Sequence, residues 1–181
     1  MSENKSTNEQ LHEILKFQKG DFFMKQGKVC TVIGQLLKGV MRGFEYDIDG
    51  NEITTHFYQE GDLIVGSFLP NGKMTFTIET LEDCDVSVAN YLEVMANVNK
   101  DREITEVITR EFQKLNQQLQ SRLVSLLNLN SLKKYELFLK EYPSLINRVP
   151  NYYIANYLGI TPTQLSRARK KFVENSNKKS L

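Results

Sequence analysis

The sequence is poor in the residues that build disulfide, zinc, iron–sulfur or haem centres. Its cysteines are Cys30 and Cys84, its histidines are His12 and His56, and none of them stands at CxxC or Cys/His ligand spacing. This spacing argues against a disulfide framework or a structural zinc site and favours buried free thiols. Two cysteines cannot supply the roughly four ligands of an iron–sulfur cluster, and two histidines are too few to argue for haem. We therefore expect no metal and no cofactor.

Long apolar runs are missing as well. No stretch approaches the roughly 20 apolar residues needed to cross a bilayer, and the polar N-terminus MSENKSTNEQ lacks the apolar core of a signal peptide. No nucleophile, base and acid stand at a recognisable catalytic spacing. The sequence thus predicts a cytoplasmic protein, without membrane contact and without enzymatic activity. Its 181 residues, 40% of them hydrophobic, suffice for one or two small domains.

The charge is nearly balanced over the whole chain but unevenly distributed. Residues 143–181 hold seven Lys or Arg against one acidic residue, Glu174, whereas residues 1–142 hold sixteen against twenty-one. Clustered positive charge is the electrostatic footprint of polyanion binding. The C-terminal end is therefore the part expected to bind a polyanion.

This basic end has the layout of two short helices joined by a tight turn, in VPNYYIANYLGITPTQLSRARKK at residues 149–171. Gly159 permits the left-handed turn that ends the first helix. Thr161 is a side-chain N-cap, and Pro162 occupies the first position of the second helix, where its missing N–H costs nothing. The apolar residues recur at helical spacing and provide a common core, namely Ile154, Ala155, Leu158, Ile160, Leu165, Ala168 and Phe172.

The other face of the second helix carries hydroxyl, amide and basic side chains. These are the donors that contact base edges and phosphates when a helix enters a DNA major groove, so the pattern predicts a helix-turn-helix in which Arg167 reads a guanine. An ordinary helical hairpin with a solvated basic face is the alternative from this pattern alone. The candidate DNA-binding residues are Thr161, Thr163, Gln164, Ser166, Arg167, Lys170 and Lys171.

The stretch IANYLGITPTQLSRARKK resembles the helix-turn-helix signature of the Crp/Fnr superfamily of bacterial transcription regulators, through its Ile-Ala, Leu-Gly-Ile-Thr and Leu-Ser-Arg elements. The resemblance implies an N-terminal β-roll of the cyclic-nucleotide-binding type, then a long dimerisation helix, then a DNA-binding domain that carries a β-hairpin wing in several relatives. It also implies a homodimer on double-stranded DNA with an inverted-repeat operator, and RNA polymerase as a further partner. The polar end VENSNKKSL predicts a short or absent wing.

The preceding residues match this order. From Phe22 onward, short apolar runs alternate with Gly, Asp and Asn, which predicts the strands of an antiparallel roll, with a hairpin at the turn Asp49-Gly50-Asn51. The segment LHEILKF at residues 11–17 suggests a short helix before them. The predicted fold class is therefore α+β, with a disordered leader and short helix at 1–16, an effector β-roll at 17–96, a dimerisation helix at 97–128 and a helix-turn-helix domain at 129–181.

The roll departs from the relatives that bind cyclic nucleotide, in which a Gly-Glu pair holds the ribose and an Arg followed by Ser or Thr holds the cyclic phosphate. Here Val-Gly at 65–66, or Gly-Ser at 66–67 if the register slips by one, stands at the first place, and Met-Thr at 74–75 at the second. Both charged anchors are missing, and the adjacent Lys73 lacks the bidentate fork of Arg. The resemblance therefore implies a degenerate effector pocket, with an unknown effector, at Gly66, Ser67, Lys73 and Thr75.

From about Asn99 the periodicity becomes helical, with apolar residues at steps of three and four that Arg122 interrupts. A long helix packed on its own domain is the alternative, but the roll would then leave the stripe exposed, so a parallel homodimer is favoured. The resemblance places a hinge near Asn128–Asn130, and Ser131 is expected to cap the next helix. The predicted dimer residues are Ile108, Phe112, Leu115, Leu119 and Leu126.

These observations predict a homodimeric, sequence-specific DNA-binding transcription regulator that does not respond to cyclic nucleotide. The alternative from another class is a signalling module that binds a ligand or partner and whose DNA-reading helix no longer functions.

Overall fold

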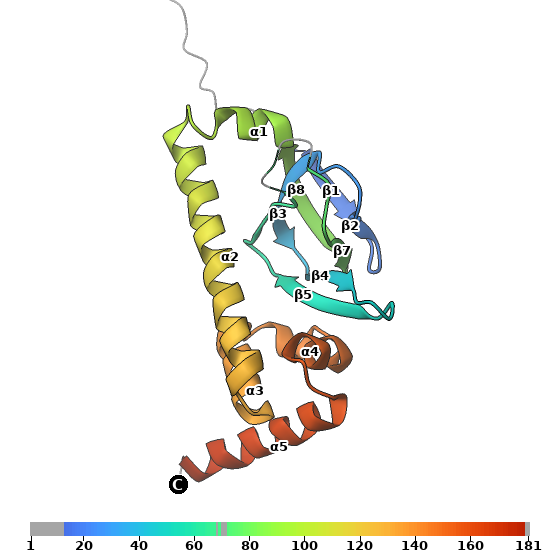
Figure 1. The fold of residues 1–181 in the computed structure, drawn as a ribbon, viewed down its shortest axis with the longest axis vertical. Coiled ribbons are helices and arrows are strands. Elements are labelled where there is room, and N and C mark those ends of the chain that lie inside the picture. The colour runs from blue at the N-terminus through green and yellow to red at the C-terminus, as the bar shows by residue number, and fades with distance from the viewer. Residues whose placement is uncertain (1–12, 68, 70–71, 180–181) are drawn as a thin grey trace, which may run out of the picture. The chain divides into compact units, whose positions relative to one another are not determined.

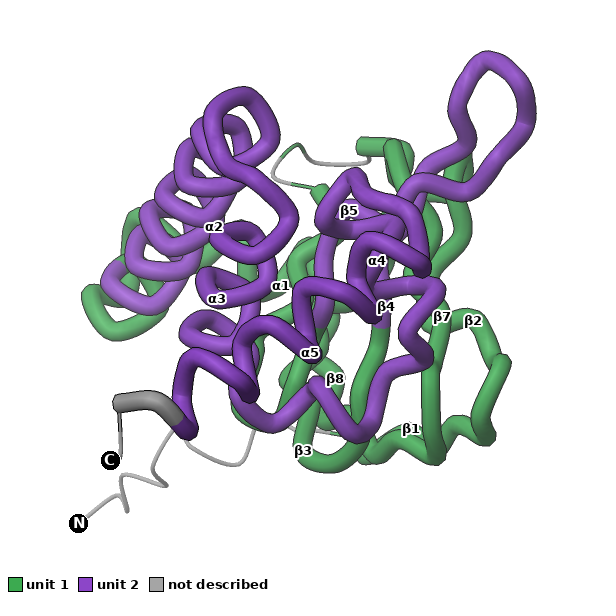
Figure 2. The backbone as a smooth tube through the Cα atoms, turned by 90° about the horizontal axis from the view of Figure 1, so that it is seen from below, with its two compact units in different colours: residues 1–41, 58–105 green, residues 42–57, 106–181 purple. Residues whose placement is uncertain are grey.

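The computed structural model describes residues 13–67, 69 and 72–179, in which eight strands are followed by five α-helices (Figure 1). The chain forms two compact units, one of residues 1–41 and 58–105, the other of residues 42–57 and 106–181 (Figure 2). The predicted α+β order, antiparallel strands first and helices after them, is confirmed. No helix in the described part of the chain combines the length and the apolar character that a membrane span requires.

The first unit is built on an antiparallel four-stranded sheet in the order β1-β8-β3-β6. Its strands are β1 (Glu13–Phe17), β8 (Cys84–Asn90), β3 (Val32–Lys38) and β6 (Leu63–Ile64), and a second antiparallel pair joins β2 (Phe22–Met24) to β7 (Thr77–Thr80). Alternate residues of β8 are buried, as expected for a strand with one face on a core. Cys30 and Cys84 are buried free thiols, as predicted.

Two local predictions for this unit are wrong or incomplete. Residues 13–17 form strand β1, not the short helix suggested for 11–17, because β8 pairs with them along their whole length. That pairing partner lies about 70 residues away in the chain, and helical periodicity in five residues is too weak to oppose it. Helix α1 (Tyr91–Asn97) was not foreseen; Asn90 caps it by accepting from the N–H groups of Leu92 and Glu93 at 2.9 and 3.2 Å. The predicted leader and His12 lie outside the described residues.

The second unit begins with the hairpin of β4 (Met41–Tyr46) and β5 (Glu52–Tyr58). Its turn is the predicted one: Gly50 has a φ of 82°, and the Asp47 carboxylate accepts from the N–H groups of Asp49 and Asn51 at 2.9 and 2.8 Å. The Asn51 side chain also donates to this carboxylate, and together these hydrogen bonds hold the pKa of Asp47 below its usual value.

The helices of the second unit are most of α2 (Arg102–Asn128), then α3 (Ser131–Glu141), α4 (Asn151–Leu158) and α5 (Pro162–Lys179). Asn130, and not Ser131, caps α3, because its side chain accepts from the N–H of Lys133 at 3.0 Å. Helix α5 continues to Lys179, so it includes most of the polar end VENSNKKSL. The interior holds an aromatic cluster in which ring centroids lie 5.2–6.0 Å apart, formed by Phe57, Phe138, Tyr142 and Tyr157.

Candidate nucleic-acid interface

Helices α4 and α5 and the turn between them form the predicted helix-turn-helix. Gly159 has a φ of 60°, and the N–H of Ile160 donates to the carbonyl of Ala155 at 3.0 Å, which closes the end of α4. Thr161 and Gln164 then form a capping box: the Thr161 hydroxyl accepts from the Gln164 N–H at 3.2 Å, and the Gln164 side-chain oxygen accepts from the Thr161 N–H at 2.9 Å. The start of α5 is thus defined by side chains within four residues of it.

The outer face of α5 carries the candidate DNA contacts. All seven predicted residues are exposed, whereas Leu165 and Ala168 on the opposite face are buried. Thr163, Arg167 and Lys170 recur at steps of four and three and therefore share one face of the helix. In the described part of the chain no carboxylate pairs with Arg167 or Lys170, so their charges are available to an external anion.

Two of the predicted DNA contacts also make hydrogen bonds within the helix-turn-helix, and one residue that was not predicted helps to hold its two helices together. Thr161 and the Gln164 oxygen are engaged in the capping box, which leaves the Gln164 amide NH₂ as the donor that faces outward. Sequence reasoning did not single out Arg169, whose guanidinium donates to the Asn151 side chain at 2.7 Å and so ties α5 to the start of α4. The sequence gives no signal for this role, because Arg167 flanks Ala168 in the same way.

The four residues of the predicted effector pocket do not assemble an anion site. Lys73 and Thr75 are exposed on either side of buried Met74, and the Ser67 hydroxyl is bonded to the backbone of Leu69. The space beside Gly66 is filled by thioethers, since a Cβ added there would lie 2.1 Å from the sulfur of Met74 and 2.8 Å from that of Met24. A compact apolar contact therefore occupies the place where a cation would be needed to hold a phosphate.

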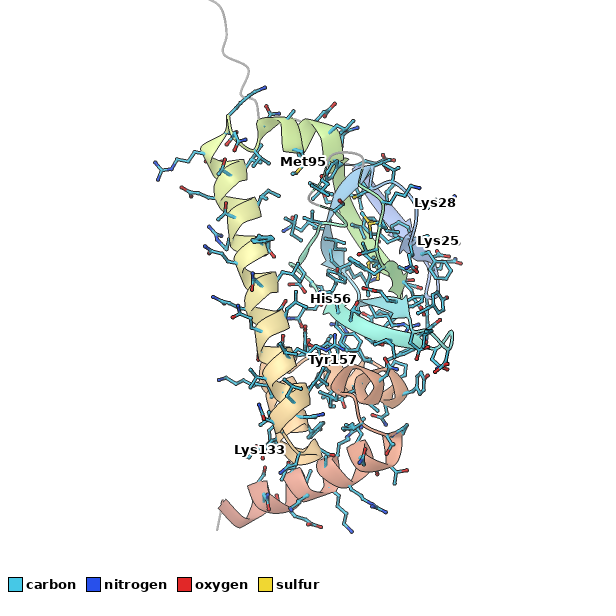
Figure 3. All side chains as sticks on the ribbon, in the orientation of Figure 1. Lys25, Lys28, His56, Met95, Lys133 and Tyr157 are labelled. Carbon is cyan, nitrogen blue, oxygen red and sulfur yellow. The ribbon has the colours of Figure 1, made fainter. Side chains whose placement is uncertain are left out.

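Met74 also lines a cavity of about 260 Å³ in the first unit. Its other lining residues come from β2 and the segment up to Val32, and sequence reasoning did not assign any of them to effector binding. Among the residues that the structure describes, its lining includes two lysines, Lys25 and Lys28, and no acidic residue. Both lysines are labelled in Figure 3, and the Lys25 ammonium lies 4.4 Å from the centre of the Phe22 ring. The cavity therefore has a mixed apolar and polar lining that includes two cationic side chains.

The predicted dimer residues of helix α2 differ in their exposure. Ile108 is buried and Leu115 is half-buried within the chain, whereas Phe112, Leu119 and Leu126 are exposed. Leu123 is also 59% exposed, and with Asn116 it completes an exposed stripe at steps of four and three along the helix. All five predicted dimer residues follow steps of three, four or seven along one side of the helix, so they differ in exposure and not in face.

Arg122, which interrupts the stripe in the sequence, is turned into the second unit. Its guanidinium donates to the carbonyls of Thr55 and Thr54 at 2.7 and 2.9 Å and lies 4.5 Å from the centre of the Tyr157 ring. His56 on β5 lies nearby (Figure 3). Burial, and then the positive charge of Arg122, lower the pKa of His56 to about 4. Burial likewise raises the pKa of Glu141 above its ordinary value.

Comparisons with known proteins agree with this geometry. Residues 14–101 match the family model of the cyclic nucleotide-binding domain. The structure is similar to that of FixK2 from Bradyrhizobium japonicum, with a TM-score of 0.81 and 16% identity over 92% of this chain and 86% of that one. It is also similar to the c-di-GMP-responsive global regulator CLP of Xanthomonas campestris, with a TM-score of 0.68 and 12% identity over 91% and 88% of the two chains.

A third similar structure is a transcriptional regulator of the Crp/Fnr family from Eubacterium rectale, with a TM-score of 0.67 and 16% identity over 90% of this chain and 79% of that one. No relative is found among curated protein sequences. At these identities the likeness concerns the fold, which is that of Crp/Fnr-type regulators.

The shifted pKa of His56 predicts a pH-dependent stability. Between pH 6.5 and about 4 the unfolded chain binds a proton at His56 that the folded chain does not, so the free energy of unfolding falls as the pH is lowered through this window. The loss between pH 8 and pH 5 should be about 2 kcal/mol larger in the wild type than in His56→Gln. Urea titrations of both proteins at the two pH values measure it. Equal losses in the two proteins would contradict this assignment.

Proposed function

We propose that this chain, which has the fold of Crp/Fnr-type transcription regulators, is a homodimeric, sequence-specific DNA-binding transcription regulator that acts in the cytoplasm without cyclic nucleotide. The observation that carries the proposal is the exposed face of α5, on which Thr163, Arg167 and Lys170 stand together without acidic partners in the described part of the chain. A helix that presents hydroxyl and basic side chains in this way suits the DNA major groove.

The exposed stripe of α2 supports the dimer. Phe112, Leu119, Leu123 and Leu126 are each 40–59% exposed, which is a large apolar surface to leave in water. Asn116 falls on the same stripe between Phe112 and Leu119. A single Asn at such a position favours a defined register and two strands in a parallel coiled coil. A second copy of this chain, related by two-fold symmetry, is therefore the proposed partner of α2.

The thioethers around Gly66 support independence from cyclic nucleotide. Binding a cyclic phosphate there would require a cation within hydrogen-bond reach, but the buried neighbour of Gly66 is Met74, and Lys73 is exposed beside it. The alternative function, a signalling module whose reading helix is inactive, predicts no steep dependence of DNA affinity on salt, whereas neutralising phosphates with Lys and Arg requires one.

The reading role of α5 is tested by two substitutions on one face. Arg167→Ala should relax the sequence preference at one position of each half-site, because an Arg paired to guanine O6 and N7 discriminates by about 1–3 kcal/mol. Lys170→Ala should weaken all sequences alike and reduce the salt slope by about one per subunit, because Lys170 is expected to hold a phosphate. Selection from a random duplex library, followed by salt-titrated binding, measures both. Recovery of the same inverted repeat, with unchanged information at every position, by Arg167→Ala would show that Arg167 does not read a base.

The dimer is tested on the outer stripe of α2. Replacing Leu119 and Leu123 with Asp places carboxylates in the proposed interface without disturbing the protomer, since both side chains are exposed in the single chain. The variant should sediment as a monomer and lose DNA affinity. Val107 is exposed on the opposite side of the helix. The substitution Val107→Asp is therefore the matched control, and this variant should remain dimeric. A dimeric Leu119→Asp/Leu123→Asp protein would place the interface elsewhere.

Independence from cyclic nucleotide is tested by calorimetry with cyclic AMP and cyclic GMP. We expect no saturable heat up to about 1 mM ligand, a concentration at which even a binding free energy of roughly −4 kcal/mol would be detected. DNA affinity should be the same with and without the nucleotides. Micromolar binding accompanied by a gain in DNA affinity would show that the thioether contact at Gly66 yields to the ligand.

A further inference from the structure

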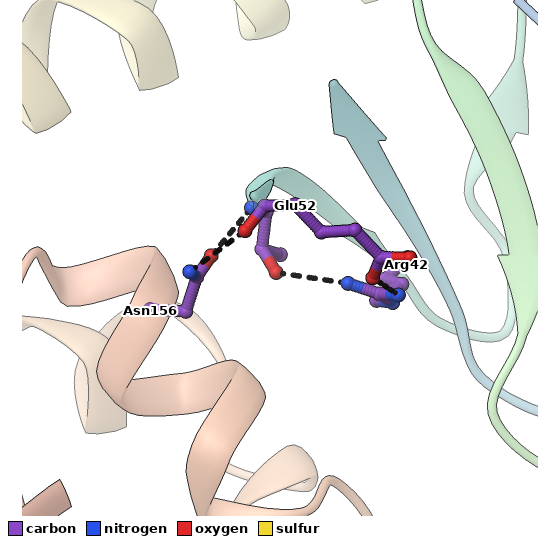
Figure 4. A network of polar contacts seen from close by, with 4 residues as sticks. Arg42, Glu52 and Asn156 are labelled. Atoms are coloured by element: carbon purple, nitrogen blue, oxygen red, sulfur yellow. Dashed lines mark hydrogen bonds and ion pairs between the residues drawn. The ribbon is translucent and has the colours of Figure 1, made fainter. Parts of the chain in front are cut away.

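In the second unit, side chains of the hairpin β4–β5 contact α3 and α4, and these two helices pack against α5, which carries the candidate DNA-reading face. Phe57, at the end of β5, inserts its ring into the aromatic cluster of α3 and α4, 5.2 Å from Tyr157 and 6.0 Å from Phe138. Arg42, on β4, is 1% exposed, and its guanidinium lies 4.3 Å from the Phe44 ring and 3.9 Å from the Tyr153 ring of α4. Arg42 is also ion-paired with Glu52 on the facing strand (Figure 4).

A single asparagine completes the outer edge of this hairpin. β5 is the last strand of its sheet, so the backbone groups of its outer edge have no neighbouring strand. The Asn156 side chain of α4 fills this place: its amide oxygen accepts from the Thr54 N–H at 2.6 Å, and its NH₂ donates to the Glu52 carbonyl at 2.9 Å (Figure 4). One side-chain amide thus satisfies a carbonyl and an N–H two residues apart, as a residue of an adjacent strand would do.

We infer that Asn156 is a positioning residue for DNA reading: by completing the edge of β5, it fixes α4 and α5 to the hairpin, so that hairpin and reading helices move as one body. Asn156 lies in the first helix of the helix-turn-helix and faces away from α5's outer surface, toward a strand more than 100 residues earlier in the chain. In this arrangement the outer face of α5 is exposed, and we take it as the state that binds DNA and that the contact holds. The inference rests on the proposed DNA-binding function.

The hairpin is also the covalent route from the first unit to this contact. β4 follows β3 through residues 39–40, and β5 leads back through Gly61 to β6, and both β3 and β6 belong to the first unit. Gly66, the predicted effector position, follows the end of β6 by two residues. A change in the path of either connection would therefore alter the position of Glu52 and Thr54, which Asn156 holds.

The test is Asn156→Ala, with Asn175→Ala as the matched control on the exposed surface of α5. If two hydrogen bonds fix the reading state, their loss should lower the population of that state and weaken binding to the duplex selected by the wild type by about 5- to 50-fold, with an unchanged salt slope. Asn175→Ala should bind as the wild type does. An Asn156→Ala protein that is folded and binds within about twofold of the wild type would overturn the inference.

Amide hydrogen exchange measures whether DNA binding is coupled to residues 52–57, which a purely structural role of Asn156 would not require. Coupling is reciprocal, so saturating the wild-type protein with DNA should slow amide exchange across residues 52–57, which include the Thr54 N–H. In Asn156→Ala saturated with DNA, this protection should be lost while protection of α5 persists. Protection of 52–57 that survives in the variant would indicate direct contact with DNA, and no protection in the wild type would indicate no coupling; either result contradicts the inference.

The experiments distinguish a failure of the proposed DNA-binding function from a failure of the positioning role alone. If the wild-type protein bound no duplex at any salt concentration, the DNA-binding proposal and the positioning role would fall together, but Asn156→Ala should still accelerate exchange at 52–57 and in α4, because the contact itself is part of the fold. Normal DNA binding by the wild type, with no effect of Asn156→Ala on affinity or on DNA-induced protection, would reject the positioning role alone.

Discussion

The outer edge of β5 is the feature on which the second unit depends. An edge strand presents N–H and C=O groups that would otherwise pair with another chain or stay without partners when buried. Here two side chains from different helices cover it: the Asn156 amide bonds to Glu52 and Thr54, and the Arg122 guanidinium to the carbonyls of Thr54 and Thr55. Because these bonds are directional, they fix the orientation of α2 and α4 on the hairpin, which apolar packing alone would leave less defined.

Buried and exposed arginines have opposite uses in this protein. Arg42 is buried and Arg122 is half-buried, and both are held by aromatic faces, by carbonyl or hydroxyl oxygens and, for Arg42, by a carboxylate. These partners compensate for the lost hydration of a guanidinium, so the charge stabilises an interior. Arg167 on α5 has none of these partners within the described residues and faces water. Its charge is therefore free to attract a phosphate or a base edge.

The predictions from sequence were correct where the interacting residues are close together in the chain and wrong where they are far apart. The turn at Gly159, the cap at Thr161 and the start of α5 at Pro162 are as predicted, because each depends on hydrogen bonds within five residues. Strand β1 was mistaken for a helix because its partner β8 lies far away in the chain. For α3 the error was one residue: Asn130 and Ser131 are both good capping residues, and only the entry of the chain into the helix decides between them.

In the candidate site, the two helices, the turn between them and the basic outer face of α5 could be predicted from the sequence, since they follow from helical periodicity and local capping. The exposed stripe of α2, the inward turn of Arg122 and the bonds from Asn156 to β5 are known only from the folded chain. The last two outcomes depend on partners between 67 and 104 residues away, on backbone groups that every residue possesses. A sequence does not mark such partners, because a peptide N–H or carbonyl carries no residue identity until the fold brings it to the edge of a sheet.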